Sequence, residues 1–408
     1  MLLEFSVKNF RSFQDEQTLS LLAGKGSEQL ESNTFSFPGI PTMVRSAVIY
    51  GPNAGGKSNL IKALYFLQQF ILLSCTGYQE KQKIPLQQFR LNSASIVEPS
   101  EFSIDFVCDT IRFNYRIALN QEQVLSEELH AFPKKYRQTW FTRFWNVSLN
   151  AYEWYYGPNF KGEHKAWEQM TRSNALYLST AVQFNSEQLR PLFLWFKEQL
   201  VVLFQHGHLQ QETLFNPDLT FQFLKDSSSR LWIQRFMECA DVGIEDFILA
   251  EEETPPIKKT LVRTQHQMND MDQKVLFDLL QDESHGTQRL FLQAGGWLKS
   301  LREGLVLCID ELDLHLHANI VNYLVELFHS SKLNQKNAQL IFTTHNTSLL
   351  DNDLFRRDQV WFLQKDKEQR SRLYSLLDFK PRKEEALGKG YLRGRYGALP
   401  FTGKFRFS

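Results

Sequence analysis

The sequence predicts an α/β fold with an antiparallel β flank and an inserted α-helical subdomain, and three stretches of the 408-residue chain support this. The first is a short apolar strand over 47–50, which runs into a glycine-rich loop and then an amphipathic helix. The second is a fully apolar run over 305–309, typical of a strand buried in a parallel sheet. The third is an alternation of apolar and polar residues over 102–117, which indicates half-exposed antiparallel strands.

The glycine-rich loop over 51–58 reads Gly-Pro-Asn-Ala-Gly-Gly-Lys-Ser and fits the pattern G-x-x-x-x-G-K-[ST]. Glycines let backbone N–H groups curve around phosphate oxygens, and the start of the following helix adds positive potential. Lys57 can then reach the β- and γ-phosphates of a nucleotide, and the Ser58 hydroxyl can ligate Mg²⁺. A chance match in an ordinary turn is the alternative, and the flanking strand and helix argue against it.

Composition allows a large core, since 42% of the residues are hydrophobic. The 46 basic and 46 acidic residues cancel, so any contact with nucleic acid must be local. The four cysteines are scattered without C-x-x-C spacing, which argues against a disulfide framework or a zinc site and predicts a cytoplasmic protein. No apolar run of about 18 residues occurs, so we expect no membrane span, and the first ten residues lack the apolar region of a signal peptide.

The N-terminal segment predicts a β-hairpin, because apolar and polar residues alternate over 3–8 and a return strand fits 17–22. Further strands are expected over 125–132, 139–147 and 152–156, so that one antiparallel sheet spans roughly 100–157.

Helical runs replace this pattern over 165–240, and strands over 245–250, 260–264 and 275–279 are expected to return to the main sheet. The acidic run over 251–253 is expected to be a solvated turn. The predicted division is an N-terminal lobe over 1–160, an inserted helical subdomain over 161–243, a C-terminal lobe over 244–379 and a basic-aromatic tail over 380–408.

Asp310 and Glu311 follow the apolar strand over 305–309, at the strand end where α/β proteins place their ligands. Asp310 can hold Mg²⁺ through water, and Glu311 can polarise the water that attacks a γ-phosphate. His345 follows the next apolar strand, over 339–344, and can sense or stabilise the same phosphate. The alternatives are a helix cap with an acidic first turn and a structural histidine; the glycine-rich loop upstream favours the functional assignment.

Other motifs are less specific. Ser284 and Gly286 precede a helix and can form an anion-binding end, although most serines at that position are plain caps. The pairs His315/His317 and His206/His208 lack a third ligand nearby, so we do not expect a metal there. The tail over 380–408 has eight basic and two acidic residues with interleaved aromatic residues, which fits nucleic acid, an acidic partner, or packing on its own head.

Taken together, these motifs resemble the ABC-type P-loop ATPase heads of the SMC/RecF group. More closely, the chain resembles AAA-family ATP-binding proteins of prokaryotic abortive-infection and phage-defence loci. The resemblance rests on Asn9–Phe13, Gly51–Ser58, Arg172–Leu176, Gln183–Asn185, Ser284–Thr287, Leu312-Asp313 with His317, Thr344–Asn346 and Gly390–Pro400, and so covers nearly the whole chain.

The resemblance implies a homodimer or higher oligomer in which two heads sandwich ATP and Mg²⁺. It assigns catalysis to Glu311 and His345, and Mg²⁺ to Ser58, Asp310 and one of Gln87 and Gln88, with Gln88 as the tentative choice. It assigns nucleotide contacts to Arg11, Asn53, Gly55, Gly56, Lys57, Ser58 and Asn59, and contacts across the dimer seam to Ser284, Gly286, Thr287 and Asp313. The chain departs from the family pattern in its Ser-His-Gly-Thr motif and at His315.

OLD-type relatives carry a nuclease domain after the head, whereas only the 63 residues 346–408 follow His345 here. The leading hypothesis is therefore an ATP-driven switch that controls a separate effector, a nuclease or toxin, in antiphage defence. The alternatives are a RecF-like or SMC-like DNA-repair or clamp ATPase, a nucleotide-responsive scaffold with negligible hydrolysis, and, more weakly, a transporter ATPase.

Overall fold

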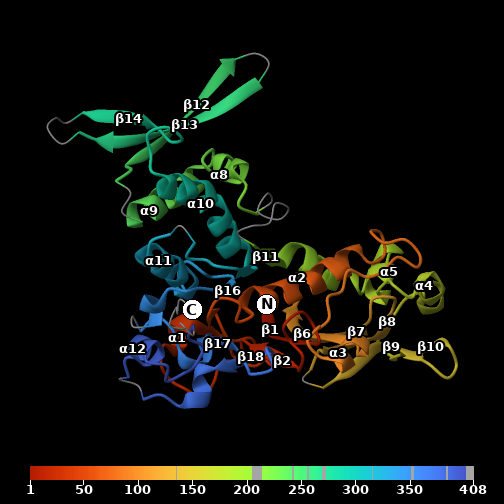
Figure 1. Ribbon diagram of the computed structural model, residues 1–408. Helices are drawn as coiled ribbons and strands as arrows, with labels where there is room; N and C mark the ends of the chain where they lie inside the picture. Colours follow the sequence, from red (N-terminus) through yellow and green to blue (C-terminus); the bar gives the residue numbers. More distant parts are fainter. Residues whose placement is uncertain are drawn as a thin grey trace, which may run out of the picture.

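A computed structural model describes residues 1–134, 136–204, 214–240, 243–254, 257–268, 273–314, 316–350, 353–382 and 385–400. Within these residues the strands form sheets of six, seven and three strands and one two-stranded ribbon (Figure 1). The four cysteines, all of them described, are free thiols. Of the described helices, none combines the length and the apolar character that a membrane crossing requires.

The six-stranded sheet is the central one, and it is parallel except for its last strand. In spatial order its strands are β11 (Leu200–Leu203), β15 (Val306–Ile309), β16 (Gln339–Thr343), β5 (Ser46–Tyr50), β17 (Val360–Lys365) and β18 (Ser371–Ser375). Every residue of β5, β15 and β16 is buried, as expected for strands covered on both faces. The predicted α/β class and the three apolar strands are confirmed.

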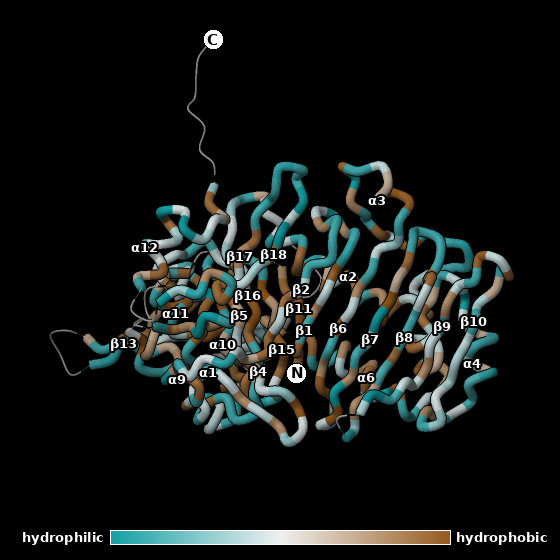
Figure 2. Tube along the Cα trace, turned by 90° about the horizontal axis from the view of Figure 1, so that it is seen from below, coloured by the Kyte–Doolittle hydropathy of each residue, from teal (hydrophilic) through white to brown (hydrophobic). Residues whose placement is uncertain are grey.

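The seven-stranded sheet is antiparallel throughout and forms the predicted flank. Its order is β10 (Ala151–Tyr156), β9 (Gln138–Asn146), β8 (Val124–Phe132), β7 (Ile111–Leu119), β6 (Ser100–Cys108), β1 (Leu2–Lys8) and β2 (Gln17–Ser20). In Figure 2 the strands β6 to β10 follow one another towards one end of the molecule. Buried and exposed residues alternate along β7, because one face packs on the core and the other meets solvent.

The helices expected over 161–243 do not pack as one group, because strand β11 of the central sheet lies between them. On one side, α4 (His164–Met170), α5 (Tyr177–Gln183), α6 (Arg190–Leu194) and η1 (Trp195–Gln199) pack with α2 (Lys57–Leu73) and the antiparallel sheet. On the other side, α8 (Pro217–Phe223) and α9 (Ser227–Cys239) pack on α10 (His285–Glu303). The domain boundaries given above stay a prediction.

A separate three-stranded sheet projects beyond α8, α9 and α10 (Figure 1). It consists of β12 (Asp246–Thr254), β13 (Ile257–Gln267) and β14 (Lys274–Asp278), which pair only with one another among the described strands. The prediction that these strands return to the main sheet is wrong, and so is the turn over 251–253, which lies inside β12. No residue of β14 is buried, whereas every residue of the central strands β5, β15 and β16 is buried.

The remaining elements are short, apart from one helix beside the central sheet. They are α1 (Leu30–Asn33), β3 (Thr34–Phe35), β4 (Met43–Val44), α3 (Ser93–Val97), α11 (Ala318–His329), η2 (Thr347–Leu350), η3 (Arg357–Gln359), η4 (Leu376–Phe379) and α12 (Leu387–Leu392). The described part of the C-terminal tail packs on its own head. Tyr391 and Tyr396 are buried there, and their rings stack on Phe362 at 5.5 and 5.8 Å. These two aromatic side chains are therefore not free to stack on nucleic acid; residues 401–408 lie outside the described chain.

Two large hydrophobic cores lie on opposite faces of the central sheet. Along β5, Ala47 and Ile49 belong to the core shared with the antiparallel sheet, whereas Val48 and Tyr50 belong to the core shared with α10 and α11. The same alternation holds in β15. It follows from the pleat, which points successive side chains to opposite faces.

His329, at the end of α11, is buried against this sheet, with its Nε2 atom 2.8 Å from Ser46 Oγ. Burial, reinforced by nearby Arg45, lowers the pKa of His329 to about 3. Between pH 6.5 and 3 the unfolded chain therefore binds a proton that the folded chain excludes, so stability present above pH 6.5 is lost as the pH falls. We expect His329 to cost about 2 kcal/mol at pH 5 relative to pH 7.5.

Urea unfolding at the two pH values checks this effect. The His329→Gln variant should lose about 2 kcal/mol less than the wild type on acidification, while a variant of the exposed His317, His317→Gln, should match the wild type. Equal acid sensitivity of the wild type and His329→Gln would contradict the assignment.

Candidate functional site

The glycine-rich loop between β5 and α2 has no room for side chains at three positions. A Cβ atom on Gly51 would lie 2.1 Å from the carbonyl oxygen of Leu363, and one on Gly55 would lie 2.9 Å from the same oxygen. Gly56 caps α2 with φ = 117°, and a Cβ there would lie 2.3 Å from Ser371 Oγ. The loop backbone therefore fits close against β17 and β18, while Asn53 is exposed at its tip. Such a bare backbone at a helix start suits phosphate oxygens.

Lys57 is buried at the start of α2. Its Nζ atom donates to Gly51 O at 2.8 Å and to Pro52 O at 3.3 Å, and it lies 3.0 Å from His345 Nε2. Burial lowers the pKa of Lys57 to about 8, although the carboxylates of Asp310, Glu311 and Asp313 favour its charged form. The Lys57 ammonium at the start of α2 thus lies close to three carboxylates that follow β15, far along the chain.

The two acids after β15 are oriented by the neighbouring strand β16. The hydroxyl of Thr343 donates from Oγ1 to Asp310 Oδ1 at 2.7 Å. Thr343 Oγ1 also accepts a hydrogen bond from the backbone N–H of Glu311 at 2.7 Å. The backbone at Glu311 is left-handed, with φ = 56°, which is uncommon for a residue with a side chain. Sequence reasoning missed Thr343 as an orienting group, because a threonine at a strand end has no distinctive pattern.

His345 is joined to both sides of this cluster. Its backbone N–H donates to Asp313 Oδ2 at 3.3 Å, and its ring faces Lys57. Burial and the charge of Lys57 lower the pKa of His345, so the ring is neutral at pH 7 and can accept a hydrogen bond from the ammonium. The structure therefore brings together five predicted site residues, Lys57, Asp310, Glu311, Asp313 and His345.

The N-terminal turn over 9–13 lies beside the loop. Asn59 donates from Nδ2 to Ser12 Oγ at 2.8 Å, and Ser371 Oγ lies 2.8 Å from both Ser12 Oγ and Gly55 O. Asn59, predicted to contact nucleotide, is thus engaged with this turn. Ser12, part of the predicted Asn9–Phe13 motif, and Ser371 support the loop. Ser371 was not singled out from the sequence, since no motif marks it.

A cavity of about 530 Å³ opens beside the acids, lined by Ser58, Asp310, Glu311, Arg11 and Gln87 among others. Gln88 does not line it, because its Nε2 atom donates instead to the carbonyl of Glu98 at 2.7 Å. This placement favours Gln87 over Gln88, the tentative choice, and the metal ligand itself stays a prediction. Gln87 is the glutamine that the structure brings to the acids, held by the bond from Arg11 N to Gln87 O at 2.7 Å.

Among the described residues, no three His, Cys, Asp or Glu side chains form a cluster that could hold a metal ion. Mg²⁺ does not require one, because it is commonly bound by one or two protein oxygens together with substrate phosphates and waters. Ser58, Asp310 and Gln87 supply such oxygens along one cavity wall. These residues therefore fit a magnesium–nucleotide complex. His206, His208 and His315 lie outside the described residues, and His317 caps α11 by accepting from Asn319 N.

Of the predicted seam residues, Asp313 belongs to this cluster, whereas Ser284, Gly286 and Thr287 stand apart from it. Ser284 caps α10 by accepting the backbone N–H of Thr287 at 3.1 Å, and its carboxyl-side neighbours His285 and Gly286 begin the helix. A Cβ on Gly286 would meet nothing nearer than Ser284 Oγ at 3.8 Å. No hydrogen bond, ion pair or cavity within the described chain joins Ser284, Gly286 or Thr287 to the glycine-rich loop.

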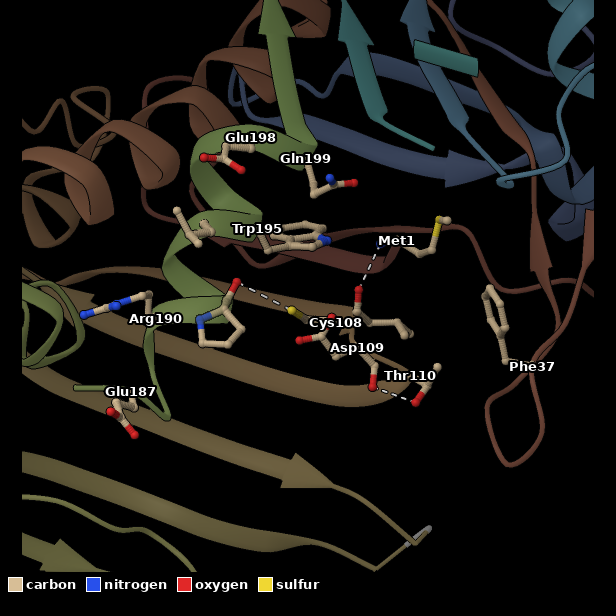
Figure 3. A pocket seen from close by; sticks show the side chains of 13 residues that line it. Met1, Phe37, Cys108, Asp109, Thr110, Glu187, Arg190, Trp195, Glu198 and Gln199 are labelled. Atoms are coloured by element: carbon tan, nitrogen blue, oxygen red, sulfur yellow. Dashed lines mark hydrogen bonds between the residues drawn. The ribbon is translucent and has the colours of Figure 1, made fainter. Parts of the chain in front are cut away.

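A second hollow, of about 700 Å³, lies between the β6–β7 turn and η1 (Figure 3). Met1, Cys108 and Trp195 line it, and the amino group of Met1 donates to Val107 O at 3.0 Å. Burial raises the pKa of the Cys108 thiol to about 11. The thiol is therefore protonated at neutral pH, which argues against nucleophilic cysteine chemistry in this hollow.

Comparison with known proteins finds one matching family and similar solved structures. The family profile described as "AAA domain, putative AbiEii toxin, Type IV TA system" matches residues 46–351. Among solved structures, the chain is similar to the SMC head domain from Thermotoga maritima, with 12% identity and a TM-score of 0.42 over 92% of this chain and 98% of that one. It is also similar to cbiO1 from Clostridium perfringens, part of the ABC transporter complex cbiONQ, with 10% identity and a TM-score of 0.30 over 90% and 96% of the two chains. No curated protein matches.

Proposed function

The chain belongs to the AAA_21 family of AAA domains, and on that basis we propose that it is an ABC-type P-loop ATPase whose ATP-bound dimer controls a separate effector. One observation carries the ATPase assignment. Lys57, Asp310, Glu311 and His345 come from three separate segments, and the parallel order of β15, β16 and β5 brings them to one edge of the sheet. This is the sheet edge at which α/β proteins bind their ligands.

Each residue has a distinct task in phosphoryl transfer to water. The bare loop backbone binds the phosphates, and the Lys57 ammonium, now shared with Gly51 O and His345, compensates the charge of the γ-phosphate. Glu311 accepts a proton from the attacking water, with its backbone fixed by Thr343. The neutral ring of His345 accepts a hydrogen bond from the Lys57 ammonium beside the γ-phosphate. Mg²⁺ held by Ser58, Asp310 and Gln87 would neutralise charge on the phosphate oxygens.

A second copy of the chain completes the site in this proposal. The exposed Ser284 caps the 19-residue helix α10, the partly exposed Gly286 lies in its first turn, and neither is joined to its own glycine-rich loop. The start of a helix of this length is suited to an anion. Two heads arranged head to tail would bring the start of α10 against the γ-phosphate of the nucleotide bound by the partner, with Asp313 in the seam between the heads.

The effector and the setting are inferred from the family. Its description names an AbiEii toxin and a type IV toxin–antitoxin system, which supports a role in abortive infection. We place the protein in the cytoplasm, where ATP closure of the dimer would release or engage a toxic or nucleolytic partner.

Mixing two inactive variants tests the composite site. Lys57→Met removes the phosphate cation, and Ser284→Arg blocks the seam, so each should be inactive alone. A one-to-one mixture forms heterodimers that keep one intact site, and about a quarter of wild-type turnover should return. Ser93→Arg, at the exposed start of α3, serves as the control and should stay active. A mixture that remains inactive, or an active Ser284→Arg protein, would overturn the dimer proposal.

A further inference from the structure

The cavity beside Asp310 and Glu311 extends well beyond the catalytic residues, along one face of α2. Ser58, Lys62, Tyr65 and Gln69 line it, at intervals of three or four residues that place them in one row along the helix. Of the glycine-rich motif, only Ser58 belongs to the lining. Most of this volume therefore lies outside the phosphate cradle that the loop forms.

Aromatic rings make up much of its wall. Phe10 and Phe66 lie with ring centroids 5.5 Å apart and an interplanar angle of 37°, and Tyr65 meets Phe204 edge to face at 5.4 Å. Phe70 and Tyr78 extend the same wall. A planar ring system gains most from such surroundings, because aromatic pairs favour offset and edge-to-face contacts.

Polar groups with free hydrogen-bonding capacity border this aromatic wall. The side chains of Lys62, Gln69 and Gln87 make no hydrogen bond or ion pair to another described residue. Arg11 has a buried Nε atom without a partner in the described chain and a left-handed backbone with φ = 52°. Two cations, two amides and two carboxylates thus line the same cavity.

We propose that this cavity binds a nucleoside monophosphate unit in addition to the ATP held by the glycine-rich loop. The base would stack among the aromatic rings, the amide of Gln69 would bind its edge, and Arg11 and Lys62 would take the phosphate. Asp310 and Glu311 repel a phosphate and so orient it away from themselves. The volume of about 530 Å³ lies in the range of small-molecule sites.

The position gives this ligand a means to act on hydrolysis. Because Glu311 lines the same cavity, the bound unit borders the water that Glu311 activates. The unit has two sources with the same chemistry, a free mononucleotide and the end of a nucleic-acid strand. This inference concerns binding, and it does not require the dimer or the effector of the proposed function.

Calorimetric titration of the full chain distinguishes these sources. The protein is first saturated with Mg²⁺ and ATPγS to fill the glycine-rich loop, and then titrated with dTMP, thymidine, and 5′-phosphorylated or unphosphorylated oligothymidylate. One unit should bind per chain, and the phosphorylated ligands should bind better than their unphosphorylated forms. A preference for the oligomer over dTMP identifies a strand end, and equal affinity identifies a free nucleotide.

Two variants locate the site. Tyr65→Ala should weaken binding of every ligand about tenfold by removing a stacking surface, whereas Lys62→Ala should weaken only the phosphorylated ligands. The exposed residues Tyr136 and Lys83 provide matched controls, Tyr136→Ala and Lys83→Ala, which should bind normally. Absence of binding, binding that ATPγS abolishes, or binding that both cavity variants leave unchanged would overturn the proposal. ATP hydrolysis is measured separately from this binding. A negative result for the cavity therefore does not bear on the proposed ATPase, and the two proposals can fail independently.

Discussion

Replacing Glu311 by glutamine is expected to slow ATP hydrolysis by about 10²–10⁴-fold while ATP binding is retained. The amide has nearly the shape of the carboxylate and keeps the backbone bond from residue 311 to Thr343, but it cannot accept a proton from water. Phosphate release under saturating ATP measures the rate, and titration with a fluorescent ATP analogue measures the affinity. Since hydrolysis no longer opens the dimer, the ATP-bound dimer should also accumulate in size-exclusion chromatography.

An exposed glutamate on α11 supplies the matched control. Glu326→Gln makes the same chemical change away from the cluster and should hydrolyse ATP at the wild-type rate. If Glu311→Gln also kept the wild-type rate, the general base would have to be another residue and the proposed mechanism would be wrong.

Gly51→Ala is expected to destabilise the fold by about 3 kcal/mol and to abolish ATP binding. The added methyl group would lie 2.1 Å from the carbonyl oxygen of Leu363, far inside van der Waals contact. Leu363 is a buried residue of β17, which pairs with β5 on one side and β18 on the other, so it cannot withdraw without disturbing the central sheet. Urea unfolding measures the stability, and calorimetry measures ATP binding.

Gly286→Ala makes the same substitution where there is room. The nearest atom to the new methyl group would be Ser284 Oγ at 3.8 Å, and the position lies in a helix, where alanine is preferred over glycine. Its stability should equal or slightly exceed that of the wild type. Equal stability of the wild type and Gly51→Ala would show that the loop does not pack against β17 as described.

The sequence was sufficient to predict the central strands and the residues at their ends. Buried parallel strands read as short apolar runs, and the residues after them reach one sheet edge whatever the strand order, so Lys57, Asp310, Glu311 and His345 could be placed together. The antiparallel flank was predicted equally well, from the alternation of apolar and polar residues along its strands. What these patterns share is that each is local in sequence.

Contacts that depend on which strands are neighbours could not be predicted in this way. Thr343 orients Asp310 only because β16 lies beside β15, and Ser371 supports the loop only because β18 begins nearby. Neither strand neighbour can be predicted from the residues next to it in the sequence. The strands over 246–278 were assigned to the wrong sheet for the same reason, since strand propensity does not name a partner.

The choice between Gln87 and Gln88 shows the limit at the scale of one residue. Both are glutamines in the same loop, and the distinction comes from distant groups. Arg11 N donates to Gln87 O, and Asn9 Oδ1 accepts from Phe89 N at 3.1 Å. These bonds fix the rotation of the loop, so that one side chain faces the cavity and the next faces Glu98.

The central sheet separates two cores, and its strand β5 contributes alternate side chains to both. Neither half of the molecule can unfold alone, because loss of either core exposes one face of β5, the strand that precedes the glycine-rich loop. The two halves therefore form a single cooperative folding unit. Nucleotide bound at that loop consequently stabilises the antiparallel flank as much as the lobe that contains the catalytic acids.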